Sequence, residues 1–194
     1  SDAIYFDGTS DYITVPYHEG LEFGTGDFTI DFWFKGNHTI PGNSSSVLET
    51  GNDAFNVGYV STSGELLTFV SGTPGQWDIS GGSGRSLGQS NTSAFSHHAL
   101  VRNGTTWYTF KDGVQQTTWT HSGSVLDGTL LESGRRGGQY LSGYVDELRF
   151  SVGIARWTSG FTPPTSAYAG GSVNATGTAT STANTALTAP TTGD

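Results

Sequence analysis

The chain lacks cysteine and methionine and has few basic residues. Without cysteine it can form neither disulfide bonds nor thiolate metal sites. Lysine and arginine together number 8 against 17 acidic residues, which gives a formal net charge of −9 at pH 7. Because nucleic-acid affinity depends on clustered lysine and arginine, we expect no nucleic-acid partner. No run approaches the roughly 20 apolar residues of a membrane-spanning helix, so we expect no membrane insertion.

The absence of methionine includes the first position, which is Ser1. We therefore expect a processed product or a fragment of a longer protein. Glycine is abundant, with 29 residues, and aromatic side chains make up 12% of the chain. No long segment has the apolar period of a helix, so the composition predicts short strands joined by many turns. The predicted fold class is all-β.

Three segments alternate apolar and polar residues as strands do. Residues 3–15 predict two strands joined by a turn. Residues 97–114 predict a hairpin whose turn is the dipeptide Asn103-Gly104. Residues 28–35 predict a strand with one wholly apolar face, which consists of Phe28, Ile30, Phe32 and Phe34. That face is expected to lie in the core.

Residues 143–168 predict the last core strand, followed by an aromatic clasp. The strand alternates regularly except for one out-of-step carboxylate, Asp146. We expect a short turn at residues 151–153 and a helical stretch at residues 154–157. The sequence Phe161-Thr162-Pro163-Pro164 then excludes both a helix and a central strand.

Two motifs lie near opposite ends of residues 3–168. Residues 6–13 have the pattern F-D-G-x-x-D-Y-I, and residues 153–158 read GIARWT. With the strand at 28–35 and the hairpin at 97–114, they resemble the laminin-G-like domains of the concanavalin A-like lectin/glucanase superfamily. The ending is most similar to the versions carried on bacteriophage virion proteins. The resemblance covers residues 3–168 and implies a two-sheet antiparallel jelly-roll sandwich with an extended C-terminal arm.

We expect the sandwich to occupy residues 1–169. Residues 170–194 contain eight threonines and neither aromatic nor basic residues, so they cannot bury enough surface to fold alone. They are predicted to form a linker or an assembly arm. Within the sandwich, residues 71–94 form a long polar stretch, and such loops on a rigid scaffold often carry binding residues.

Catalysis is not expected. Glucanases of the superfamily use an E-x-D-x-(x)-E strand that places two carboxylates on one face, and this spacing is absent. The nearest acidic pair, Asp146-Glu147, is adjacent, so regular alternation would direct the two side chains to opposite faces. The sequence also lacks a G-x-S-x-G elbow, an H-E-x-x-H helix and a P-loop.

Metal binding has one candidate. The pair His97-His98 is adjacent on a strand, so its side chains diverge and a core role is favoured. Members of the superfamily often bind calcium, and the resemblance implies Asp7 and Asp146 as ligands, because the first and last strands would be neighbours. Hydrogen bonding of these acids to nearby turn amides is the alternative.

Sugar binding commonly uses an exposed aromatic ring with a few polar groups beside it. Trp77 and Trp119 are the candidates, Trp77 because it lies alone in a polar loop. A core or clasp role is favoured for Trp33 and Trp157.

The leading functional hypothesis is a non-catalytic phage virion surface module that binds host-surface glycan or decorates the particle. Its expected partners are host polysaccharide and other virion subunits, in an oligomeric assembly. One alternative is a purely architectural virion domain whose tail docks on a neighbouring subunit by strand addition. Another is a carbohydrate-binding module of a secreted bacterial protein.

Overall fold

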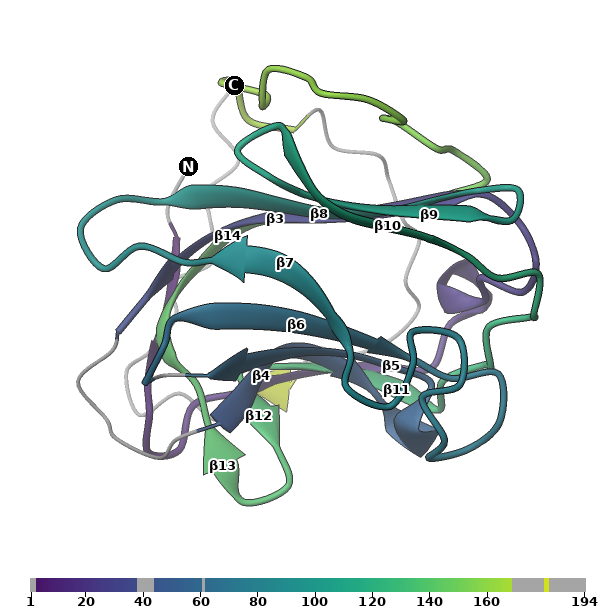
Figure 1. Ribbon diagram of the computed structural model, residues 1–194. Coiled ribbons are helices and arrows are strands. Elements are labelled where there is room, and N and C mark those ends of the chain that lie inside the picture. Colours follow the sequence, from purple (N-terminus) through teal and green to yellow (C-terminus); the bar gives the residue numbers. More distant parts are fainter. Residues whose placement is uncertain (1–2, 38–43, 61, 169–179, 182–194) are drawn as a thin grey trace, which may run out of the picture.

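The computed structural model describes residues 3–37, 44–60, 62–168 and 180–181 (Figure 1). Two antiparallel β-sheets lie face to face, and the helices in the described residues are two short 3₁₀ turns, η1 (Glu19–Leu21) and η2 (Gly51–Asp53). The predicted all-β sandwich is therefore confirmed.

Sheet 1 forms the upper layer in Figure 1 and has the strand order β1-β14-β3-β8-β9-β10. These strands are β1 (Ile4–Asp7), β14 (Ser142–Val152), β3 (Phe28–Gly36), β8 (Ser96–Asn103), β9 (Thr106–Lys111) and β10 (Val114–Thr120). The first and last strands of the domain pair with each other, as the resemblance implied.

Sheet 2 forms the lower layer and has the order β15-β2-β11-β4-β5-β6-β7. Its strands are β15 (Thr180–Ser181), β2 (Ile13–Pro16), β11 (Leu130–Ser133), β4 (Ser44–Thr50), β5 (Phe55–Val60), β6 (Glu65–Val70) and β7 (Arg85–Gln89). A small hairpin of β12 (Arg135–Arg136) and β13 (Gln139–Tyr140) projects below it.

The core lies between the two sheets. The predicted apolar face of β3 is at most 1% exposed, and it packs against the inner residues of sheet 2, such as Phe55, Val57 and Leu66. Strand β7 closes one side of the sandwich, because the hydroxyl groups of Thr109 and Thr117 donate to the Ser86 carbonyl, at 2.6 and 3.3 Å.

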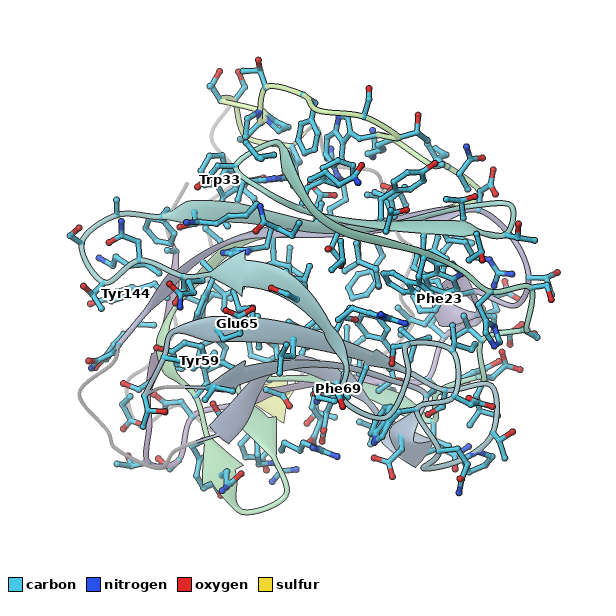
Figure 2. The ribbon with its side chains drawn as sticks, viewed as in Figure 1. Phe23, Trp33, Tyr59, Glu65, Phe69 and Tyr144 are labelled. Atoms are coloured by element: carbon cyan, nitrogen blue, oxygen red, sulfur yellow. The ribbon has the colours of Figure 1, made fainter. Side chains whose placement is uncertain are left out.

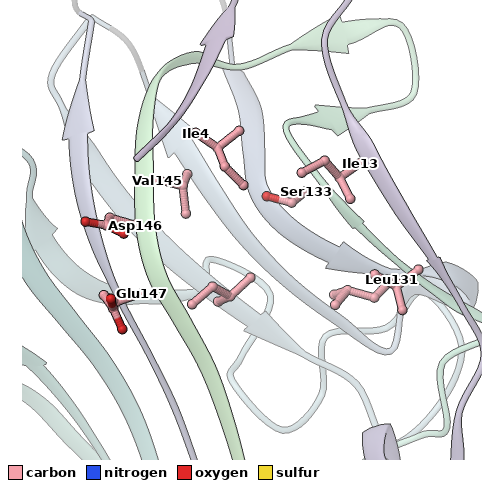
Figure 3. Close-up of a pocket in the computed structure, with 9 residues that line it drawn as sticks. Ile4, Ile13, Leu131, Ser133, Val145, Asp146 and Glu147 are labelled. Carbon is pink, nitrogen blue, oxygen red and sulfur yellow. The ribbon is translucent and has the colours of Figure 1, made fainter. Parts of the chain in front are cut away.

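The opposite side of the sandwich is more open. A pocket of about 160 Å³ lies there between β1 and β14 on one sheet and β2 and β11 on the other (Figure 3). Its lining is mostly aliphatic: Ile4, Ile13, Val15, Leu131, Val145 and Leu148, with Ser133, Asp146 and Glu147.

A β-bulge interrupts β14 at Asp146–Arg149, and Glu147 there has a φ of 52°. The extra residue shifts the alternation, which explains why Asp146 was out of step. It also corrects the expectation that Asp146 and Glu147 diverge, since Figure 3 shows both side chains on the same side of β14. The Glu147 carboxylate is used structurally, because it accepts the Tyr168 N–H at 2.7 Å.

The segment after β14 is extended, so the helix expected at residues 154–157 is wrong, and β14 continues to Val152 where a turn was expected. Thr29 is the reason for the extended path. Its hydroxyl donates to the Ile154 carbonyl and accepts the Arg156 N–H, both at 2.9 Å. These backbone groups are therefore held by β3 instead of by a helical turn.

The predicted aromatic clasp is confirmed. It runs over the outer face of sheet 1 (Figure 1), where Trp157 and Phe161 stack with ring centroids 3.9 Å apart. The clasp packs on a second, smaller cluster of buried residues, formed by Ala99, Val101 and Phe110. We use the name clasp for residues 154–168.

Beneath the clasp lies a buried charge network centred on Asp31. Arg149 donates two hydrogen bonds to its carboxylate, at 3.0 and 2.8 Å, and the Tyr168 hydroxyl donates at 2.5 Å. The His97 ring nitrogen Nε2 lies 3.2 Å away. Burial alone would raise the pKa of Asp31, but the hydrogen bonds from His97, Arg149 and Tyr168 outweigh it and lower that pKa.

The two adjacent histidines diverge as predicted. His97 and His98 are both fully buried, His97 beneath the clasp and His98 between the sheets, where its Nδ1 lies 2.9 Å from the Leu87 carbonyl oxygen. Burial lowers the pKa of His98 to about 4. The core role of this pair is confirmed for the described structure.

One short piece of the C-terminal segment is part of sheet 2. Thr180 pairs with Thr14 and Ser181 with Ile13, which adds β15 to the edge strand β2. Residues 169–179 and 182–194 lie outside the described residues, so the linker or arm over 170–194 stays a prediction.

Candidate functional site

Trp77 lies in the loop that joins β6 to β7, where its ring contacts the outer face of sheet 2. The ring meets that of Phe69 edge to face, with centroids 5.5 Å apart. Figure 2 shows Phe69 on the side of sheet 2 that faces away from sheet 1. Trp77 has a φ of 50°, which is uncommon for a bulky residue. Its backbone N–H donates to the Ser71 hydroxyl at 3.1 Å. The loop therefore fixes the Trp77 backbone in an unfavourable conformation.

A row of residues crosses the outer face of sheet 2 next to Trp77. The strand register places each member directly opposite the next, and the row consists of Phe69, Asn56, Glu49, Glu132 and Thr14 on β6, β5, β4, β11 and β2. With about 4.8 Å between neighbouring strands, the five residues span about 19 Å. The row thus joins an aromatic end to a polar and acidic end.

The β12–β13 hairpin supplies two arginines to this row. Arg135 forms an ion pair with Glu132 and lies over the Tyr12 ring, 3.7 Å from its centroid. Arg136 lies 3.4 Å from a Glu49 carboxylate oxygen and 3.7 Å from one of Asp53. The Arg136 guanidinium is also 5.6 Å from the centroid of the Trp77 ring. Arg136 therefore connects the aromatic end of the row to its carboxylates.

Glu49 is electrostatically distinct from the other carboxylates of the row. Burial raises the pKa of Glu49 to about 7, against the opposing effect of Arg136. At neutral pH its carboxyl is thus present in both forms and can either donate or accept a hydrogen bond. Glu132 is also buried, at 7% exposure, but Arg135 and the Thr14 hydroxyl hydrogen-bond to it.

Asn56 presents an unused hydrogen-bonding group beside Glu49. The residue is 1% exposed, and within the part of the chain that the structure describes its Oδ1 has no hydrogen-bond partner. Its amide nitrogen contacts the Ser46 hydroxyl and lies 3.5 Å from Glu49. Buried polar atoms are rarely left unpaired, but this oxygen is itself buried, so a ligand could reach it only if neighbouring side chains moved.

Trp119, the second predicted sugar platform, is not brought to this row. It lies on β10, stacks on the buried Trp107 with centroids 5.4 Å apart, and donates its indole N–H to the Ile79 carbonyl at 3.0 Å. Arg85 also lies over the ring, 5.3 Å from its centroid. The structure thus uses Trp119 for packing at the edge of the core.

The two predicted calcium ligands are likewise not brought together. Asp7 lies opposite Ser142 in the β1–β14 ladder, four residues from Asp146. That separation is about 13 Å along a strand, whereas calcium ligands bind within about 2.6 Å of the ion. Among the described residues, no group of three or more His, Cys, Asp or Glu could hold a metal ion. One calcium ion shared by this pair does not fit the geometry.

Asp7 instead stabilises its own turn. Its carboxylate accepts the Thr9 N–H at 2.7 Å, the Ser10 N–H at 3.2 Å and the Thr9 hydroxyl at 2.6 Å. The Thr9 hydroxyl hydrogen bond is the main reason why the pKa of Asp7 is lowered. This matches the alternative of hydrogen bonding to turn amides.

Sequence reasoning missed most of the row. The alternation of strand residues could show that Asn56, Glu49 and Glu132 face outward, but not that the strands bearing them are neighbours. The local signal nearest to the row is Arg135-Arg136-Gly137-Gly138, a basic pair beside turn residues, which indicates a loop and no binding role.

The Laminin_G_3 family model, described as concanavalin A-like lectin/glucanases superfamily, matches residues 7–153. The chain belongs to this family. A comparison with curated proteins gave no match. The family assignment agrees with the motif at residues 6–13 and with the sandwich, and the clasp lies entirely beyond the matched residues.

Solved structures show the same fold at low sequence identity. Domains LG4-5 of the mouse laminin alpha1 chain match with a TM-score of 0.55 and 16% identity, over 82% of this chain and 45% of that one. The CBM40 of a Ruminococcus gnavus IT-sialidase, bound to alpha2,3 sialyllactose, has a TM-score of 0.52 and 14% identity, over 80% and 91%. Domain 4 of the Geobacillus stearothermophilus arabinanase AbnA, in complex with arabinotriose, has a TM-score of 0.53 and 15% identity, over 79% and 71%.

The chain thus spans less than half of the laminin structure it matches. None of the helices among the described residues is long and apolar enough to cross a membrane.

Proposed function

We propose that this domain is a non-catalytic glycan-binding module whose binding surface is the outer face of sheet 2 at Trp77. The observation that carries the proposal is the juxtaposition of the Trp77 and Phe69 rings with Asn56, Glu49 and Arg136. Two similar structures were solved with bound oligosaccharides, which supports a sugar as the ligand class.

The chemistry of these groups suits a pyranose. An aromatic ring packs against the C–H face of a sugar, while carboxylate, amide and guanidinium groups hydrogen-bond its hydroxyls. Arg136 donates hydrogen bonds, and Glu49 can donate or accept them because its pKa is about 7. The row is long enough to take more than one sugar unit.

In its biological setting, we propose that the domain lies on the surface of a phage virion and binds host-surface polysaccharide as part of an oligomeric assembly. The support is the resemblance of the GIARWT ending at residues 153–158 to virion proteins. The alternative setting is a carbohydrate-binding module of a secreted bacterial protein, which would use the same surface. In that case the parent gene would also encode a catalytic domain.

A glycan array with purified protein tests the binding role. We expect retention of at least one bacterial surface polysaccharide, with affinity at least tenfold lower in Trp77→Ala. Ile154→Ala is the matched control, because Ile154 is an exposed apolar residue at the end of the other sheet. Absence of binding to every polysaccharide, or equal binding by both variants, would contradict the proposal.

An architectural role is the second candidate, and β15 supports it. The C-terminal segment already adds a strand to β2 within one chain, through Thr180 and Ser181. The same edge would accept the equivalent segment of a neighbouring subunit. Removal of residues 170–194 would then abolish self-association in sedimentation experiments, whereas an unchanged sedimentation profile would exclude this role.

Calcium binding stays a proposal, restricted to a site that does not use Asp7 and Asp146 as a pair. Melting temperatures measured with calcium and with chelator would decide it. An increase with calcium supports a site, and equal values remove it.

A further inference from the structure

The outer face of sheet 1 carries a second group of aromatic residues beside the clasp. Tyr5, Tyr144 and Lys35 lie directly opposite one another on β1, β14 and β3. The Tyr5 and Tyr144 ring centroids are 4.7 Å apart, and Lys35 Nζ is 4.2 Å from the centroid of the Tyr144 ring. The three side chains therefore form a continuous row across three strands.

A fourth residue completes this row from the loop before β8. The Phe95 ring meets the Tyr144 ring edge to face at 6.4 Å, and Lys35 Nζ lies 5.5 Å from the Phe95 centroid. Lys35 is thus held between two rings, which orders a side chain that is usually mobile. We call Tyr5, Tyr144, Lys35 and Phe95 the tyrosine row.

The tyrosine row is accessible, unlike the aromatic residues under the clasp. Tyr5 is 49% exposed, although it is a large ring on a sheet face. The clasp covers β8 and β9, where Trp157 and Phe161 pack against Ala99 and Phe110. An exposed ring beside an ordered hydrogen-bond donor is the arrangement that sugar binding uses.

The charges around the row select the class of sugar. Of the ion pairs among the described residues, none involves Lys35, whereas Arg135, Arg136 and Arg149 each pair with a carboxylate. Asp7 and Asp146 follow Tyr5 and Tyr144 by two residues, and the whole chain has a net charge of −9. An acidic sugar would be repelled there, while a neutral one can accept hydrogen bonds from Lys35.

We propose that the tyrosine row is a second binding site, for a neutral pyranose that stacks on Tyr5 and accepts a hydrogen bond from Lys35. The inference rests on the proposed glycan-binding function and extends it. Because the two sites lie on the outer faces of opposite sheets, one domain would bind two separate glycan chains. Two polysaccharide chains would then be cross-linked by a single copy of the domain.

Calorimetric titration tests the second site, with neutral hexasaccharides of N-acetylglucosamine, of galactose and of glucose, and with a galacturonate hexamer. We expect two molecules of a neutral hexasaccharide per chain for the wild type, one for Tyr5→Ala and one for Trp77→Ala. Lys35→Gln should weaken the second site several-fold. Melting temperatures verify that each variant is folded, and Tyr5→Phe, which keeps the ring, should restore the stoichiometry of two.

The outcomes separate the two proposals. If the wild type binds one hexasaccharide per chain and only Trp77→Ala abolishes that binding, the tyrosine row is not a binding site. The proposed function then remains intact. Preferential binding of the galacturonate hexamer at the Tyr5-dependent site overturns the neutral-sugar assignment. Absence of binding of every hexasaccharide by the wild type overturns the tyrosine row, and the polysaccharide array then decides the proposed function independently.

Discussion

The outer faces of the two sheets carry similar residues but use them in opposite ways. On sheet 1, Asp31 is fully buried under the clasp, and Arg149, Tyr168 and His97 all contact its carboxylate. On sheet 2, Glu49 remains partly exposed, at 18%, with one arginine shared with Asp53. The Asp31 carboxylate therefore has a full set of hydrogen-bond donors, whereas the Glu49 carboxylate does not.

The pKa values express this difference. Hydrogen bonds lower the pKa of Asp31 in spite of its burial, whereas burial raises the pKa of Glu49 to about 7. A carboxylate whose hydrogen bonds are complete stabilises the fold, while one whose burial is uncompensated has capacity left for a ligand. The comparison therefore assigns a structural role to the outer face of sheet 1 beneath the clasp, and a binding role to that of sheet 2.

The largest expected effect comes from removing Asp31. Asp31→Ala leaves the Arg149 guanidinium without its carboxylate in a largely buried site, and we expect a loss of about 4 kcal/mol in the free energy of unfolding. The corresponding drop in melting temperature would be about 10 °C. Asp53→Ala is the control, because its pair with Arg136 is exposed and worth about 0.5 kcal/mol. Equal losses in both variants would remove the distinction between the two faces.

The second prediction concerns the clasp itself. Trp157→Ala removes the ring that stacks on Phe161, and we expect a loss of about 3 kcal/mol in urea-induced unfolding. Ile154→Ala should change stability little, because Ile154 is 50% exposed. A loss below about 1 kcal/mol for Trp157→Ala would show that the clasp does not stabilise the sandwich.

The third prediction uses pH. The pKa of Glu49 rises from 4.5 in the unfolded chain to about 7 in the folded protein. Between these values the folded state binds more protons, so the free energy of unfolding falls as pH increases, by about 3 kcal/mol from this residue. Glu49→Gln should remove that part of the pH dependence. Asp31 gives the opposite pH dependence of the free energy of unfolding. Because its pKa is lowered in the folded protein, its carboxylate stabilises the fold above the usual aspartate pKa, and this stabilisation is lost in acid.

Thermal unfolding of the wild type, Glu49→Gln and Asp31→Asn between about pH 2 and 8 would measure both slopes, because the Asp31 slope lies below the usual aspartate pKa. If Glu49→Gln kept the decline between pH 4.5 and 7, the assignment of a raised pKa to Glu49 would be wrong.

Arg136→Gln is expected to have the smallest effect on stability. It should also lower glycan affinity specifically. Because Arg136 is 45% exposed, we expect a change of about 0.5 kcal/mol in the free energy of unfolding. Glycan affinity should fall about fivefold, since Arg136 lies between Trp77 and Glu49. Arg156→Gln, on the clasp side, should leave affinity unchanged, and a similar loss in both variants would argue against a site on sheet 2.

Local patterns in the sequence were sufficient for β3, for the β8–β9 hairpin and for the aromatic character of the clasp, but not for β7, which lies within the predicted loop at residues 71–94. The alternation in β3 and the presence of the β8–β9 hairpin agree with the structure, because they depend on residues that are close in the chain. The turn itself is shifted by one residue to Gly104-Thr105, since Asn103 pairs with Thr106 as the last residue of β8. The helix expected at residues 154–157 failed because Thr29, more than 120 positions earlier, takes the hydrogen bonds of Ile154 and Arg156. A distant side chain decided a local conformation.

The candidate site was only partly predictable for the same reason. Trp77 could be chosen because a lone tryptophan in a polar loop has no local packing partner. Trp119 looked similar in sequence, yet it packs on Trp107 across the β9–β10 pair. The carboxylates of the row could not be chosen at all, because Glu49 and Glu132 become neighbours only through the β4–β11 pairing.

The sequence alone determined the fold class, the inward face of β3 and the aromatic character of the clasp, because alternation and turn chemistry act over a few residues. The tertiary structure decided which outward-facing residues meet. Strand order and register join β2, β11, β4, β5 and β6 into one row, bury Asp31 with a full set of partners, and leave Glu49 with an incomplete one. Burial and pairing depend on neighbours that are remote in the chain, so the electrostatic properties of both faces follow from the fold.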